Sequence, residues 1–187
     1  MLTYKIGNSL ELLDEVRQVD MLLTDIPYNI SQKSGGLRNL TYGEWDINID
    51  ADVFKIVEKS LSKVSGSAYI FCSDKQLSGI LKYMESIGMM TRTIVWLKSN
   101  PSVLNGEKIW ESGAEFCAFG KKPSSTYNYK CKPNYYKTKV IRDRIHSSQK
   151  PVGLLVYLIM ASSNINDTIL DPFLGSGSTI DACRRTN

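Results

Sequence analysis

The sequence has no long hydrophobic run, and this absence limits where the protein can work. No apolar stretch approaches the roughly 20 residues that a membrane-spanning helix needs. Residues 1–5 also lack the charged and then apolar plan of a secretory signal peptide. These absences predict a cytoplasmic protein with no membrane partner.

The chain is also poor in the residues that bind zinc or build disulfide frameworks. It has four cysteines and one histidine, and no two cysteines have the C-x-x-C spacing. Structural zinc sites use four Cys or His ligands, and small secreted domains pair their cysteines. The sequence therefore predicts no metal site and no disulfide framework, and we expect the thiols to be buried or idle.

Positive charge is in small excess over the whole chain but is concentrated in one segment. The formal net charge is +4, far from the excess of a histone. Residues 121–150 contain many basic residues, four interleaved tyrosines and a single acid, Asp143. A solvated loop accounts for this composition as well as a surface that meets phosphates and bases does.

Short apolar runs alternate with helical patterns, which predicts one α/β domain over residues 1–187. Strands are expected at residues 20–24, 67–72, 91–97, 115–119 and 168–171. Helices are expected at residues 51–64, 77–84, 152–161 and from 176 to the end. Stretches rich in Gly, Ser and Asn predict loops at residues 30–41 and 99–113.

The tetrapeptide Asp25-Ile26-Pro27-Tyr28 follows the first predicted strand. Ligands bind at the carboxyl edge of the sheet in open α/β folds. There Asp25 and a backbone carbonyl could accept both hydrogens of an exocyclic amine and aim its lone pair at a methyl donor. Pro27 stiffens the turn, and Tyr28 supplies a flat face for an extruded base. Taken alone, so short a motif is more often an ordinary strand-ending turn with a half-buried tyrosine.

A glycine-rich segment, residues 171–179, follows the last predicted strand and opens the last helix. Gly175 and Gly177 allow a positive φ and a close approach of the backbone to a ligand. Free N–H groups at a helix start favour an anionic group, and we expect the methionine carboxylate of a cofactor there. Phe173 could pack against that ligand. A turn that serves only packing is the alternative.

The segment His146-Ser147-Ser148-Gln149-Lys150-Pro151 precedes the apolar helix. Pro151 suits the first turn of a helix. Gln149 and Lys150 would face whatever lies at that helix start. A capped surface turn is an equally good interpretation of this segment alone.

Together, the three segments resemble the beta class of amino-methylating DNA methyltransferases. That family has D-P-P-Y, a DNA-recognition region, H-P-x-Q-K-P and then D-P-F-x-G-x-G-x-T. This chain has its counterparts at residues 25–28, 146–151 and 171–179, in the same order. The resemblance implies an α/β, Rossmann-like S-adenosylmethionine-dependent methyltransferase fold. It also implies a mostly parallel sheet, helices on both faces and a permuted motif order.

The resemblance also implies a role for individual residues. The flipped base would be held by Asp25, Pro27 and Tyr28. Residues approximately 99–139 would form an inserted DNA-recognition region. The cofactor S-adenosylmethionine would be bound by Asp171, Phe173, Gly175, Ser176, Gly177 and Lys150.

The expected function is site-specific methylation of double-stranded DNA. In the family, an aspartate at the first motif position goes mostly with adenine N6, so Asp25 favours adenine over cytosine N4. A homodimer or a restriction-modification partner is compatible with the resemblance. The alternatives are a cytosine-N4 methyltransferase, an enzyme that methylates amino groups of RNA or protein, and an inactive DNA-binding remnant.

The chain departs from the family pattern at three places. Ile26 and Ser147 replace prolines, which a motif that works through backbone carbonyls tolerates. The family continues beyond the last helix into a strand that carries an acidic residue for the cofactor ribose, whereas the sequence ends at Asn187. We therefore expect a C-terminal strand and helix to be missing, and cofactor binding to be weak.

Overall fold

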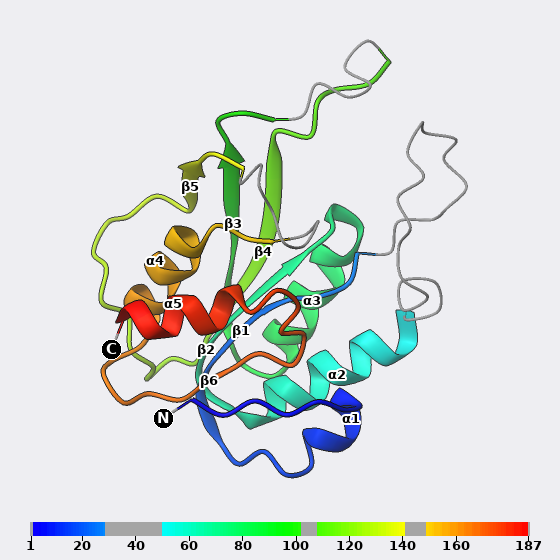
Figure 1. Ribbon diagram of the computed structural model, residues 1–187, viewed down its shortest axis with the longest axis vertical. Coiled ribbons are helices and arrows are strands. Elements are labelled where there is room, and N and C mark those ends of the chain that lie inside the picture. The colour runs from blue at the N-terminus through cyan, green and yellow to red at the C-terminus, as the bar shows by residue number, and fades with distance from the viewer. Residues whose placement is uncertain (1, 29–49, 102–107, 141–148, 187) are drawn as a thin grey trace.

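The computed structural model describes residues 2–28, 50–101, 108–140 and 149–186, which form one sheet with helices on both faces (Figure 1). The helices are α1 (Ser9–Leu12), α2 (Asp50–Lys63), α3 (Asp74–Ser86), α4 (Val152–Ser162) and α5 (Ser178–Thr186). The strands are β1 (Val19–Asp25), β2 (Val64–Cys72), β3 (Met90–Lys98), β4 (Ala114–Lys121), β5 (Tyr135–Thr138) and β6 (Ile169–Leu170). None of these described helices is long and apolar enough to cross a membrane.

The strand order in the sheet is β5-β3-β4-β2-β1-β6. The sheet is mostly parallel: β1 pairs parallel with β2 and β6, and β3 pairs parallel with β5. The exception is β4, which runs antiparallel to both of its neighbours, β2 and β3. Strand β6 therefore lies at one edge of the described sheet and β5 at the other.

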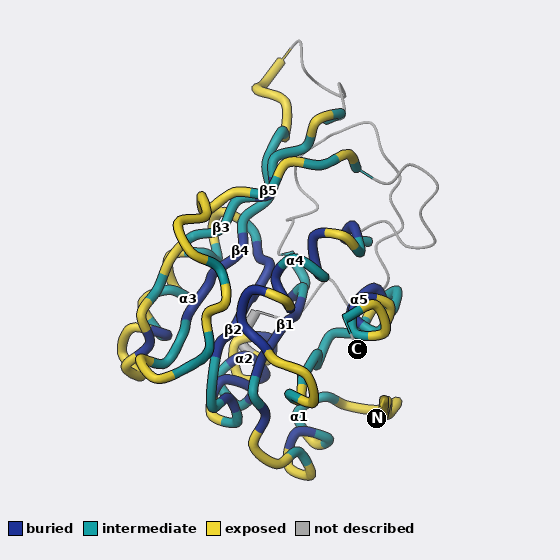
Figure 2. The backbone as a smooth tube through the Cα atoms, turned by 90° about the vertical axis from the view of Figure 1, so that its left-hand side faces the viewer, coloured by how far each residue is buried: buried dark blue, intermediate teal, exposed yellow. Residues whose placement is uncertain are grey.

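Two apolar cores lie on opposite faces of the sheet. The side chains of β1 contribute to the two cores in alternation. Leu22 faces the core under α2 and α3, whereas Met21 and Leu23 face the core under α4 and α5. Successive side chains of a strand point to opposite faces, so a central strand covered on both sides must be apolar throughout. Figure 2 shows the resulting buried band along the centre of the molecule.

The predicted strands and helices are confirmed to within a few residues at their ends, and two short elements were not predicted. The single turn α1 is too short for helical periodicity and depends on Asn8, whose side chain accepts a hydrogen bond from the Leu10 N–H. Strand β5 has little apolar character. It forms because β3 offers it an edge, with Val95 opposite Tyr135.

The reversed direction of β4 decides which residues meet at the functional edge. Strands β1, β2, β3 and β6 end at this edge, whereas β4 begins there. The carboxyl edge of the sheet therefore collects side chains from five strands: Asp25, Cys72, Lys98, Glu115 and, directly after β6, Asp171.

Candidate active site

A buried lysine lies between two carboxylates at the carboxyl edge of the sheet. The Nζ atom of Lys150 is 2.6 Å from Oδ2 of Asp25 and 3.1 Å from Oε2 of Glu115. The Lys150 side chain is 5% exposed. The other oxygen of Glu115 is 2.9 Å from Nζ of Lys98. The four side chains thus form a row of alternating charge, Lys98–Glu115–Lys150–Asp25, which we call the charge row.

Two aromatic rings flank the lysine. Its Nζ atom lies 5.2 Å from the centroid of the Tyr28 ring and 5.3 Å from that of Phe71, within the range of cation–π attraction. The Tyr28 hydroxyl donates a hydrogen bond of 3.3 Å to Oε2 of Glu115. Tyr28 is therefore oriented both by its ring and by its hydroxyl.

Burial and neighbouring charges shift the pKa values of the charge row in different directions. Burial raises the pKa of Asp25, with Lys150 acting against it. Burial disfavours the charged form of Lys150, but Asp25 and Glu115 together raise its pKa. Burial also opposes ionisation of Glu115, but Lys150 and Lys98 together lower its pKa. The ammonium group of Lys150 and the carboxylate of Glu115 are therefore both charged at neutral pH.

One oxygen of Asp25 is buried and has no hydrogen-bond partner among the described residues. Lys150 occupies Oδ2, whereas Oδ1 is the unpaired atom. Buried carboxylate oxygens are nearly always hydrogen-bonded, so an unpaired one requires an explanation. An external donor, such as the amino group of a substrate, would satisfy it.

The backbone after Asp25 is held by a glutamine that the sequence analysis missed. The Gln76 amide donates a hydrogen bond of 3.0 Å to the Pro27 carbonyl. Its oxygen accepts a bond of 3.0 Å from the Ser73 backbone N–H, as part of the capping box of α3. The only sequence signal was this S-x-x-Q pattern at a helix start.

Asp171 is used mainly to hold the glycine turn together. Its Oδ1 accepts hydrogen bonds from Thr24 (2.7 Å) and from the Phe173 backbone N–H (3.1 Å), and its Oδ2 accepts one from Thr179 (2.6 Å). These bonds join β1, the turn and α5. Burial raises the pKa of Asp171, and the hydrogen bonds from Thr179, Thr24 and Phe173 oppose that rise.

The glycines of this turn have the backbone conformation that the sequence predicts. Gly175 has a φ of 51° and Gly177 a φ of 79°, where side chains other than glycine are strained. Ser176 lies between them, and its hydroxyl is 2.9 Å from that of Ser178 at the start of α5. Phe173 packs against the core under α2 and α3.

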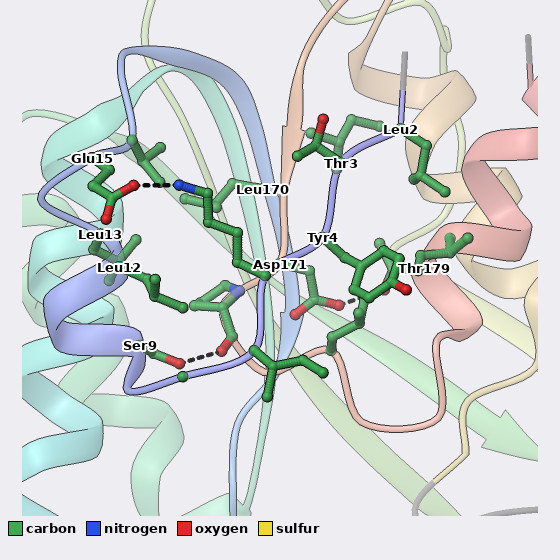
Figure 3. A pocket seen from close by; sticks show the side chains of 18 of the residues that line it. Leu2, Thr3, Tyr4, Ser9, Leu12, Leu13, Glu15, Leu170, Asp171 and Thr179 are labelled. Atoms are coloured by element: carbon green, nitrogen blue, oxygen red, sulfur yellow. Dashed lines mark hydrogen bonds and ion pairs between the residues drawn. The ribbon is translucent and has the colours of Figure 1, made fainter.

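A pocket of about 590 Å³ lies beside the turn (Figure 3). Its walls are mainly apolar and come from the N-terminal segment 2–7, from α1 and from the end of β6. Asp171 and Thr179 line it together with Leu174. The Ser9 hydroxyl donates a hydrogen bond of 2.7 Å to the Pro172 carbonyl, which fixes α1 against the turn. The sequence analysis missed this contribution of the N-terminal segment.

The site residues predicted from the sequence fall into two groups. Asp25, Pro27 and Tyr28 lie together, as do the residues of the glycine turn. Lys150 was assigned to the cofactor site, but the structure places it against Asp25, Glu115 and Tyr28. The other predicted positions of its motif, residues 146–148, lie outside the described residues.

Part of the segment predicted to read DNA lies in the interior of the protein, although its composition is typical of a surface loop. Strand β4, in the middle of residues 99–139, is central in the sheet, so apart from its first residues at the carboxyl edge only the flanking segments can face a ligand. The rings of Tyr129 and Tyr136 lie 4.8 and 5.0 Å from that of Tyr157 in α4. By contrast, Tyr135 is 50% exposed.

The basic residues of this segment are divided between two edges of the sheet. Lys121 ends β4 and therefore lies at the edge opposite Asp25, as does Lys122, whose backbone N–H donates to the Gly66 carbonyl. Lys137, opposite Leu97, and the exposed Lys139 lie toward the carboxyl edge. Of these four lysines, only the second pair is on the side of the candidate site. Arg142 and Arg144 lie outside the described residues.

Comparison with solved structures defines the class of fold. A crystal structure of M1.HpyAVI in complex with SAM matches with a TM-score of 0.73 and 26% identity, covering 96% of this chain and 86% of that chain. PvuII DNA methyltransferase (cytosine-N4-specific) has the same fold, with a TM-score of 0.73 at 18% identity over 97% of this chain and 77% of its own. The fold is therefore the α/β, Rossmann-like fold of S-adenosylmethionine-dependent methyltransferases.

Sequence comparison then gives the family. The model of the DNA methylase family, N6_N4_Mtase, matches residues 19–187, and the chain belongs to that family. Type II methyltransferase M.HinfI from Haemophilus influenzae is 27% identical over 213 residues, which cover 92% of this chain but 59% of M.HinfI. DNA adenine methyltransferase YhdJ from Escherichia coli (strain K12) is 25% identical over 214 residues, which cover 92% of this chain and 71% of YhdJ.

Proposed function

We propose that the protein transfers a methyl group from S-adenosylmethionine to the exocyclic amino group of a flipped DNA base, adenine N6. The observation that carries this proposal is the unpaired, buried Oδ1 of Asp25 at the carboxyl edge of the sheet. This atom is an acceptor in a water-poor site, next to the ring of Tyr28. A base that stacks on Tyr28 would present its amino group to Asp25.

The protein's own groups would prepare the amine for attack. The lone pair of an exocyclic amine is delocalised into the ring, which makes the amine a poor nucleophile. A hydrogen bond to Oδ1 of Asp25 draws the nitrogen toward tetrahedral geometry and gives the departing proton an acceptor. Lys150 holds the other oxygen, so the carboxylate cannot turn away. The reaction needs no covalent intermediate with the protein.

The glycine turn and the adjoining pocket fit the cofactor. S-adenosylmethionine would supply an electrophilic methyl group when bound. Ligand pockets commonly range from about 300 to 1,000 Å³ and are mainly apolar with a few polar groups. The pocket of about 590 Å³ beside Asp171 has this character. Gly175, Ser176 and Gly177 precede α5, where free N–H groups favour the methionine carboxylate. Asp171 and Phe173 support the turn.

Double-stranded DNA is the proposed substrate, and the surface around Lys137 and Lys139 is its proposed contact. The names of relatives support this substrate, because M.HinfI is a type II methyltransferase and YhdJ a DNA adenine methyltransferase. A restriction-modification partner, a homodimer and a cytoplasmic location stay predictions. Adenine is preferred over cytosine because of Asp25, on the resemblance stated above.

The test is direct measurement of the methylated base. Unmethylated DNA is incubated with the protein and S-adenosylmethionine, digested to nucleosides and analysed for N6-methyladenine. The Asp25→Asn variant should lose activity by about a hundredfold or more, because an amide is a weaker acceptor than a carboxylate. N4-methylcytosine as the product would change the assigned base. Absence of any methylated base, with DNA binding retained, would favour the DNA-binding remnant.

A further inference from the structure

Glu115 belongs to none of the three motifs, yet it is the carboxylate at this edge that pairs with two lysines, whereas Asp25 pairs with one. Its side chain is 21% exposed. It contacts Lys98 through one oxygen, and Lys150 and the Tyr28 hydroxyl through the other. Unlike Asp171, whose three hydrogen bonds join β1 and α5 through the turn, Glu115 connects two lysines and the Tyr28 hydroxyl beside Asp25.

The position of Glu115 follows from the reversed direction of β4. Glu115 is the second residue of β4 and lies opposite Trp96 in β3. The Lys98 backbone N–H donates a hydrogen bond of 2.8 Å to the Gly113 carbonyl, which holds the two strand ends together. A parallel β4 would have put this side chain at the opposite edge of the sheet.

The arrangement around Lys150 leaves one oxygen of Asp25 free. A lysine ammonium group has three N–H donors and no directional preference of its own. Because Glu115 lies on one side of Lys150, the ammonium group is held where it meets Oδ2 of Asp25 and leaves Oδ1 without a partner. With Glu115 neutral, Lys150 would interact with Asp25 alone and could bridge both of its oxygens.

Glu115 also limits how much of the lysine's charge acts on Asp25. The charge row contains two cations and two anions, so its net charge is zero when all four groups are ionised. The negative charge of Glu115 raises the pKa of Asp25, opposite to the effect of Lys150. Asp25 therefore remains a stronger hydrogen-bond acceptor than a carboxylate paired with lysine alone.

We propose that Glu115 is a positioning residue for the candidate methyl-acceptor site: it holds Lys150 on one oxygen of Asp25, orients the Tyr28 hydroxyl and keeps the other oxygen of Asp25 available to the substrate amine. This inference rests on the proposed function. Glu115 acts through Lys150, Asp25 and Tyr28, and does not itself touch the reacting atoms.

The first test is kinetic and uses a matched pair of glutamates. Glu115→Gln keeps the shape and removes the charge, whereas Glu111→Gln makes the same change at an exposed residue in the segment leading to β4. Misplacement of a reacting group by about 1 Å can cost up to about a hundredfold in rate. We expect such a fall in kcat for Glu115→Gln, a small change in KM for S-adenosylmethionine and no change for Glu111→Gln. Glu115→Asp should recover part of kcat, because it restores the charge.

The pH profile separates positioning from a purely structural role. The titratable groups that face Asp25 are Lys150, Glu115, Tyr28, Cys72 and Cys117. Because Glu115 raises the pKa of Asp25, its neutralisation should move the acidic limb of kcat to lower pH. Loss of stability alone would lower the amount of active protein without moving that limb.

A second measurement does not need methyl transfer. Titration of the Asp25 carboxyl group by NMR, in the full chain without DNA, should show a lower pKa in Glu115→Gln than in the wild type or in Glu111→Gln. If the wild type methylates no base, the proposed function fails, and this titration still decides the role of Glu115. An unchanged Asp25 titration, or a Glu115→Gln variant with wild-type kcat and pH profile, overturns the inference.

Discussion

The ammonium group of Lys150 lies 2.6 Å from Oδ2 of Asp25, although 125 positions of sequence separate the two residues. The contact joins the segment before α4 to the end of β1 and places a buried cation beside the proposed acceptor. Lys150 therefore lies with Asp25 and Tyr28, the residues proposed to hold the base. Its ammonium group contacts one oxygen of Asp25 and also pairs with the carboxylate of Glu115.

Removal of this cation should destabilise the protein strongly. In Lys150→Met, the carboxylates of Asp25 and Glu115 would face each other without a counter-charge. Breaking a buried ion pair from one side typically costs about 3–5 kcal/mol. Urea unfolding measures the loss. The control is Lys55→Met, which breaks the exposed pair with Asp52 and should cost about 0–1 kcal/mol. Equal losses in the two variants would contradict burial of the Lys150 pair.

Replacement of Tyr28 should separate the role of the ring from that of the hydroxyl. Tyr28→Phe keeps the ring and loses the hydroxyl with its bond to Glu115, whereas Tyr28→Ala loses both ring and hydroxyl. Stacking of a base on an aromatic ring is worth about 1–3 kcal/mol. Tyr28→Ala should therefore reduce kcat/KM for DNA more than Tyr28→Phe does. Equal damage from both variants would indicate that the hydroxyl matters and the stacking does not.

The two edges of the sheet should differ in their response to loss of positive charge. Lys137→Gln with Lys139→Gln should weaken DNA binding and reduce the log–log salt slope by about one for each lost phosphate contact. Lys121→Gln with Lys122→Gln removes the same charge at the opposite edge and should leave the slope unchanged. Fluorescence anisotropy of labelled DNA across a salt series compares the pairs. The same slope change in both pairs would show that binding responds only to net charge.

The hydrogen bonds of Asp171 predict that the glycine turn depends on it for stability. Asp171→Asn replaces one acceptor oxygen by a donor, which leaves the hydroxyl proton of Thr24 or Thr179 without its acceptor in a buried site. The expected loss is about 1–3 kcal/mol of unfolding free energy. Asp181→Asn, at an exposed residue of α5, should stay within about 0.5 kcal/mol of the wild type. If the unfolding midpoint of Asp171→Asn equals that of the wild type, Asp171 does not stabilise the turn.

The lowered pKa of Glu115 predicts a pH-dependent contribution to stability. A carboxylate whose pKa is lower in the folded state stabilises it above the ordinary value of 4.5, and this contribution is lost as the pH falls through the folded-state value. The difference in unfolding free energy between the wild type and Glu115→Gln should therefore have its largest value at neutral pH. It should shrink in acid, because protonated Glu115 resembles glutamine. A difference that is constant between pH 7 and pH 3 would contradict the ionised state.

Much of the fold could be predicted from local patterns. The apolar runs of β1 and β2 predict central strands, because a strand covered on both faces must be apolar throughout. The glycine turn could be predicted to carry positive φ values at Gly175 and Gly177. Strand β5 and the single turn α1 could not be predicted, since one depends on an edge offered by β3 and the other is one turn long.

The sequence by itself determined all the elements except α1 and β5, the two candidate motifs at the ends of β1 and β6, and the membership in a family of DNA methylases. These depend on residues that are neighbours in the chain. Only the tertiary structure decided that Lys150 meets Asp25, that Glu115 completes the charge row and that the basic segment is divided between two edges. The physical reason is the order and direction of the strands. A single reversed strand, β4, brings Glu115 to Lys150, which in turn contacts Asp25. It carries Lys121 to the opposite edge, and no local pattern in β4 encodes that direction.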